Sequence, residues 1–148
     1  MCLHGLPRYT HALGNLAHED KIANPDNIKF SEKLRTLFIG EDSGMHVNNF
    51  LWAYNVDTKE LSRLPSTPAG AESTGLHAVD EGNGFTYIMS NFQHAGDWEI
   101  KKDASGNVTG LHAKVYAALD PLIKKNYGDS RGKLGGAVGY LTGLPAAS

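Results

Sequence analysis

The stretch FLWAYNVDTKELSRL, residues 50–64, decides the fold class of this chain. Residues 50–56 are rich in aromatic and apolar side chains, and residues 61–64 form a second short run. Between them lies the polar sequence DTKE at 57–60, which is typical of a tight turn. Two short runs joined by such a turn predict a β-hairpin. We therefore expect a fold built from antiparallel strands.

The preceding residues extend this hairpin into a meander. NPDN at 24–27 is a strong turn sequence, residues 28–30 alternate as a short strand, and residues 31–33 form a second turn. Residues 36–39 form an apolar strand that ends at GEDSG, residues 40–44. These runs and the hairpin predict four short antiparallel strands.

The pattern then restarts. A turn at 71–75 precedes expected strands at 76–79 and 85–90, which are joined by the loop DEGNG at 80–84. Asp26 and Glu72 start the two units, 46 positions apart. Propeller blades repeat every 40–50 residues or so. The predicted fold is therefore mainly β, a partial β-propeller of about two antiparallel blades.

The two ends of the chain depart from this pattern. Residues 1–21 carry His4, His11 and His18 among helix breakers and are expected to form a flexible leader, so that the domain spans 22–148. The polar residues 97–110 predict a loop, and residues 113–127 a helix that Pro121 begins or breaks. Residues 135–141 predict a final strand.

Composition excludes several classes of protein. The net charge is −2 over 148 residues, which does not favour a nucleic-acid partner. No apolar run approaches the roughly 20 residues that a membrane span needs, and the first residues do not resemble a signal peptide. Cys2 is the single cysteine, so an internal disulfide and a cysteine zinc site are excluded. The sequence contains neither a Gly-x-Ser-x-Gly elbow nor a phosphate-binding P-loop.

Three groups of oxygen and imidazole ligands lie where the predicted strands end. They are Asn24, Asp26 and Asn27; Glu41 and Asp42 with His46, Asn48 and Asn49; and Glu72 with Gln93 and His94. Calcium takes six to eight oxygen ligands or so, and carboxylate with imidazole also suits iron, manganese or zinc. Strand ends on one rim of a propeller converge, so such ligands can meet there. The alternative is that they are turn residues and solvated side chains.

The same residues carry a resemblance to a known family. The segments are IANPDNIKF (22–30), LRTLFIGEDSG (34–44), NNFLWAYNVDT (48–58), PAGAESTG (68–75) and SNFQHAGDW (90–98). In this order and spacing they resemble the PhoX-type alkaline phosphatases. Ala95 stands where the family has a proline after Gln-His.

The resemblance implies a calcium-dependent phosphomonoesterase, with Fe³⁺ in some members, that works in the periplasm or outside the cell. Carried onto this chain, it implies catalytic roles for Gln93 and His94 and metal ligation by Asp26, Asn27, Glu41, Asp42 and Glu72. Family members are several times longer. We therefore expect the chain to be a C-terminal fragment, inactive alone, whose partners are a phosphate monoester and the remaining blades. A calcium-dependent propeller lactonase or esterase, and a non-catalytic calcium-binding module, remain alternatives.

Overall fold

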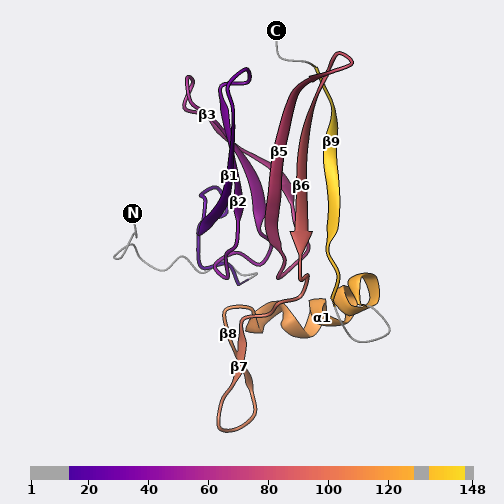
Figure 1. Cartoon of the computed structure of the whole chain (residues 1–148). Coiled ribbons are helices and arrows are strands. Elements are labelled where there is room, and N and C mark those ends of the chain that lie inside the picture. The colour runs from indigo at the N-terminus through magenta and orange to yellow at the C-terminus, as the bar shows by residue number, and fades with distance from the viewer. Residues whose placement is uncertain (1–13, 129–133, 146–148) are drawn as a thin grey trace.

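The computed structural model describes residues 14–128 and 134–145, which form two stacked antiparallel sheets beside a small hairpin and one helix (Figure 1). The elements are β1 (Pro25–Ser31), β2 (Thr36–Glu41), β3 (Phe50–Asn55), β4 (Leu61–Ser66), β5 (Glu72–Gly82), β6 (Phe85–Gln93), β7 (Ile100–Lys102), β8 (Val108–Gly110), α1 (Ala113–Tyr127) and β9 (Ala137–Pro145). The prediction of a mainly β chain with one helix is confirmed.

The first sheet is the predicted meander. Its strand order is β1-β2-β3-β4, and every neighbouring pair is antiparallel. Ile39 at its centre lies opposite Ile28 on one side and Trp52 on the other. Short apolar runs separated by polar turns were therefore sufficient to predict this sheet.

The second sheet differs from the expected second meander. Its order is β5-β6-β9, so its third strand comes from the end of the chain, after α1. The segment 97–110, expected to be a loop, contains the β7–β8 hairpin, which projects below the sheets in Figure 1. Neither sheet is closed, and the propeller remains a prediction.

The apolar core lies between the two sheets. Phe38 and Leu51 of the first sheet and Ile88 of the second are buried together, with Leu76 and Leu141 against them. Side chains alternate between the faces of a strand, which brings these residues to the same interface. Burial of each such side chain contributes about 1.5–3 kcal/mol and holds the sheets together.

A second apolar cluster joins α1 to the loops below the sheets. Ile123 of α1 is buried with Val47, Ala69, Ala71 and Ala95. The helix has the predicted bounds but passes through Pro121, which neither begins nor breaks it. Pro121 is exposed, and the apolar contacts of Ile123 lie one half-turn further along. Tertiary packing therefore overrides the cost of an interior proline, about 3 kcal/mol.

Candidate functional site

The strand ends that carry the predicted site residues lie at one end of the stacked sheets. Antiparallel strands place the start of β1, the end of β2, the start of β5 and the end of β6 on the same side. This end lies next to α1, whereas the β1–β2 and β5–β6 turns lie at the far end (Figure 1). We call it the polar end and define it by its acidic and imidazole side chains: Asp26, Asp42, Glu72, His94 and Asp97.

Glu72 organises one part of the polar end. It starts β5, lies opposite Gln93 in the strand register and is almost fully buried. Its Oε2 accepts hydrogen bonds from Nε2 of Gln93 and from Nε2 of His94, the latter at 3.0 Å. His94 itself has a positive φ of 39° and a side chain that is 43% exposed. The structure therefore brings together these three predicted residues, with the imidazole ring facing solvent.

Asp42 supplies a second carboxylate directly after β2. Burial raises the pKa of Asp42, and the negative charges of Glu72, Asp26 and Asp97 raise it further, whereas His94 acts in the opposite direction. Like charges favour the neutral acid, and a bound cation would remove this cost. The predicted grouping of Asp26, Asp42 and Glu72 at one end of the fold is thus present in the structure.

Asp26 and Asn27 form a local pair on β1. Nδ2 of Asn27 donates to Oδ2 of Asp26 at 2.6 Å, and the strand register shifts between Pro25 and Asn27. Asp26 is exposed. The negative charge of the Asp26 carboxylate acts on Asp42 and helps to raise its pKa, so we count Asp26 in the polar end. The side-chain amide of Asn27 is hydrogen-bonded to Asp26 itself.

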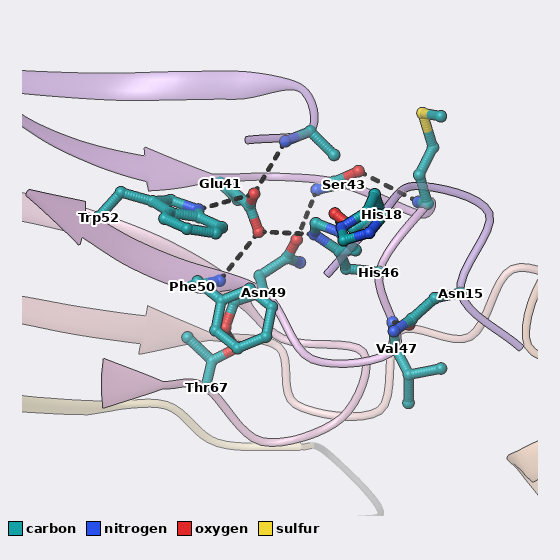
Figure 2. Close-up of polar contacts among 12 residues, drawn as sticks. Asn15, His18, Glu41, Ser43, His46, Val47, Asn49, Phe50, Trp52 and Thr67 are labelled. Carbon is teal, nitrogen blue, oxygen red and sulfur yellow. Dashed lines mark hydrogen bonds and ion pairs between the residues drawn. The ribbon is translucent and has the colours of Figure 1, made fainter. Parts of the chain in front are cut away.

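Glu41 lies apart from this group, in the interior. It is 0% exposed and accepts four hydrogen bonds (Figure 2). Oε1 accepts from the Ala23 amide and from Nε1 of Trp52, each at 2.8 Å, and Oε2 from the Phe50 amide and from Nδ1 of His46, each at 3.0 Å. Both oxygens are occupied by donors, so we leave Glu41 out of the candidate metal ligands.

His46 is the buried partner of Glu41. Its ring is 1% exposed, and the Nε2 atom lies 3.3 Å from the carbonyl oxygen of His18 (Figure 2). Both ring nitrogens therefore face oxygen atoms, one on the Glu41 carboxylate and one on the His18 backbone carbonyl. This buried contact between Glu41 and His46 is one that the sequence did not predict.

A small pocket opens at the polar end. Its volume is about 80 Å³, and it is lined by Asp42, Ser43, Gly44, Asn49, Gly70, His94, Asp97, Glu99 and His112. Asp97 and Glu99 fall in the segment expected to be a loop, and His112 had no supporting pattern. A signal that could have found the first two is their position shortly after Gln93 and His94, on either side of Trp98.

A larger groove of about 220 Å³ lies elsewhere, between the end of β4 and the inner face of β6 and β9. Its lining is mostly apolar and includes Ile88, Phe92 and Leu141. It contains none of the predicted site residues. The larger of these two hollows is therefore not the one that the predicted site residues line.

Calcium fits the donor chemistry of the polar end, because it prefers carboxylate and amide oxygens. Within residues 14–128 and 134–145, however, no three His, Cys, Asp or Glu side chains converge closely enough to hold a metal ion. Asp26, Asp42 and Asp97 therefore do not make a complete metal site in the described residues, and calcium remains a prediction. Iron remains a prediction, and Cys2 lies outside the described residues.

Comparison with known protein families, with curated proteins and with solved structures finds no match to this chain. The resemblance to the PhoX-type phosphatases accordingly rests on the five ordered segments alone. In the part of the chain that the structure describes, no helix combines the length and hydrophobicity of a membrane span.

The buried Glu41 carboxylate can be tested by Glu41→Gln. The amide places an N–H₂ group among four donors and removes the negative charge beside His46, so we expect a loss of about 3 kcal/mol or more in unfolding free energy. Thermal and urea unfolding measure it. The matched control is Glu32→Gln, in the exposed β1–β2 turn, with a change within about 0.5 kcal/mol. A melting temperature for Glu41→Gln equal to that of the control would contradict the account.

The repulsion around Asp42 predicts a pH-dependent effect of Asp42→Asn in chelator. The pKa of Asp42 is raised in the folded protein, so protonation of Asp42 stabilises the fold. This stabilisation is fully present below the unfolded pKa of about 3.9 and is lost as pH rises through the folded pKa. At pH 7 the variant should thus be more stable than the wild type, by about 0.5 kcal/mol or less for this partly exposed group. The gap should close as pH falls toward 4. Urea unfolding at both pH values checks this, and a less stable variant at pH 7 would count against the repulsion.

Proposed function

We propose that the polar end binds calcium and, through it, a phosphate monoester, as part of a metal-dependent phosphomonoesterase. The observation that carries the proposal is the gathering of four carboxylates at the polar end, where burial and then the charges of Glu72, Asp26 and Asp97 raise the pKa of Asp42. Side chains that repel one another in the absence of a cation are stabilised when one binds.

Asp42, Asp26 and Asp97 are the residues that would hold calcium. When bound, calcium supplies positive charge that binds phosphate oxygens and neutralises the charge that develops during hydrolysis. Glu72 adds its negative charge beside them and has a second task. Its Oε2 accepts from both Gln93 and His94 and fixes the direction of the exposed imidazole ring.

His94 is placed to handle a proton. Its Nε2 is held by Glu72, and its Nδ1 lies 3.8 Å from a carboxylate oxygen of Asp97. Hydrolysis of a phosphate monoester breaks the bond between phosphorus and the ester oxygen, forms one to a water oxygen, and requires a proton for the leaving alcohol. A protonated His94 can donate that proton from the ring edge that faces solvent.

The open architecture supports the further proposal that more sheets complete the fold. In the described part of the chain β1, β4, β5 and β9 are all edge strands. Large apolar side chains on β1 and β9 are exposed: Ile28 at 67%, Val138 at 78% and Tyr140 at 61%. Unpaired edges and exposed apolar residues favour association with further strands. We propose that these are the remaining blades of a propeller, in a protein that acts in the periplasm or outside the cell.

Calcium should stabilise the fold, and two carboxylates should account for most of the gain. A ligand at 100 times its dissociation constant adds about 2.7 kcal/mol, so calcium should raise the melting temperature by several degrees. Asp42→Asn and Glu72→Gln should each lose most of this rise. Glu60→Gln, in the β3–β4 turn at the far end, is the matched control and should keep it.

Phosphatase activity on p-nitrophenyl phosphate, with calcium or with chelator, is measured on the same four proteins and on His94→Ala. Calcium-dependent hydrolysis that His94→Ala reduces would support the whole proposal. Calcium binding without turnover would instead favour the non-catalytic calcium-binding module, and turnover of lactones alone would favour the lactonase. Identical melting temperatures with calcium and chelator in all four proteins would remove the support for a metal site.

A further inference from the structure

β9 is the outermost strand of the second sheet. It pairs with β6 along one side, and among the described residues no strand lies along its other side (Figure 1). A Cβ atom built on Gly139, in the middle of this strand, would meet no described atom within 4 Å. The backbone N–H and C=O groups on the free side are therefore open to another extended strand, which is the partner that such groups recognise.

The other three free edges carry residues that oppose the addition of a strand. Charged side chains and prolines protect the edge strands of natural proteins. Such residues are Asp26 and Lys29 in β1, Arg63 and Pro65 in β4, and Asp80 in β5. β9 has the sequence AVGYLTGLP, which contains no charged residue and no proline before its last position. Of the four edges, β9 is therefore the one least protected against pairing.

Residues 137–141 form the regular part of this edge. They pair with residues 88–92 of β6 without interruption, and the register shifts only beyond them, between Thr86 and Ile88 of β6. Gly143 of β9 lies at this irregularity and has a φ of 81°. A new strand can thus follow β9 in a regular ladder over residues 137–141.

The side chains of this segment alternate between the two faces of the sheet. Leu141 packs against the apolar core between the sheets, so Ala137 and Gly139 share this inner face, where the groove of about 220 Å³ opens. Val138 and Tyr140 lie on the outer face and are 78% and 61% exposed. Neither face of the segment carries a charge that would select a charged partner.

The segment is complementary to itself when two copies run antiparallel. With Gly139 opposite Gly139 of a second copy, Val138 lies opposite Tyr140 of that copy, and Ala137 lies opposite Leu141. A β-branched residue opposite an aromatic residue is a favourable cross-strand pair. The net charge of −2 gives two copies little electrostatic repulsion. The edge therefore fits a second copy of this chain.

We propose that two copies of the chain associate through β9, antiparallel about a two-fold axis at Gly139, and join their three-stranded sheets into one continuous sheet. The inference goes beyond the proposed function. Further blades would pack face to face with the sheets, whereas a strand that pairs with β9 lies in the plane of the sheet. Neither calcium nor phosphate takes part in this contact.

Charges placed on the axis test this arrangement. Gly139→Lys brings two ammonium groups together in the dimer, and Gly139→Glu brings two carboxylates together, while the open space around Gly139 accommodates either side chain in a single copy. Each variant alone should associate at least about tenfold more weakly than the wild type. An equimolar mixture of the two should associate again, because opposite charges then meet at the axis. Ser105→Lys, in the exposed β7–β8 turn, is the matched control and should behave as the wild type.

Sedimentation velocity of the full chain, from micromolar to near-millimolar concentration, measures the association. The mass of the wild type should rise toward twice that of one chain, both with calcium and with chelator. A second measurement needs no variant. In a mixture of isotope-labelled and unlabelled wild type, NMR should detect contacts between the Val138 methyl groups of one copy and the Tyr140 ring of the other.

Three outcomes would overturn the inference. They are a wild type that stays monomeric at every concentration, a dimer that Gly139→Lys leaves intact, and a dimer without contacts between Val138 and Tyr140 of different copies. A monomer would leave the edge of β9 to a strand from a different protein. If that monomer is still stabilised by calcium, the inference is refuted and the proposed function stands.

Discussion

One buried carboxylate, that of Glu41, holds together the loops on which the polar end depends. Its four hydrogen bonds come from the segment before β1, from the β2–β3 loop and from β3 (Figure 2). A buried charge is expensive unless it is fully hydrogen-bonded, and here every donor is supplied by a different backbone or ring group. The chain can satisfy Glu41 only in the native arrangement of these segments, so this contact specifies the fold as well as stabilising it.

The β2–β3 loop links the contacts of Glu41 to the polar end. Asn49 accepts from the Ser43 amide at 3.0 Å through Oδ1 and donates to the Ala71 carbonyl at 2.8 Å through Nδ2. The first bond fixes the chain beside Asp42, and the second fixes the residue before Glu72. Buried polar contacts therefore place carboxylates from two different sheets at one end, where mutual repulsion makes them suited to a cation.

Sequence patterns predicted the local elements and failed where distant segments meet. Alternation and turn residues identified the strands from β1 to β6, and helical spacing identified α1. No local pattern indicates that β9 returns beside β6, or that α1 continues through Pro121, because both depend on packing between distant parts of the chain. The polar residues of the β7–β8 hairpin likewise carry no alternation to mark them as strands.

The same limit applies to the candidate site: local patterns predicted some of its residues, and contacts between distant segments decide the rest. Asp26, Asp42, Glu72 and His94 were predicted because strand ends on one side of antiparallel sheets must gather. Glu41 and Asp42 are adjacent and chemically similar, and only contacts with Trp52 and His46 decide that Glu41 is the buried one. His112, which lines the small pocket, was missed because its burial and its hydrogen bond to the Glu99 amide are not visible in a sequence.

The central claim is that the polar end is a calcium site, and a backbone NMR titration with calcium chloride tests it most directly. The account predicts chemical-shift changes concentrated at residues 24–27, 41–44, 71–73 and 93–99. The turns at the far end, residues 32–35, 57–60 and 81–84, should stay unchanged. Spectra that do not change up to millimolar calcium, or that change mainly in the far turns, would contradict it.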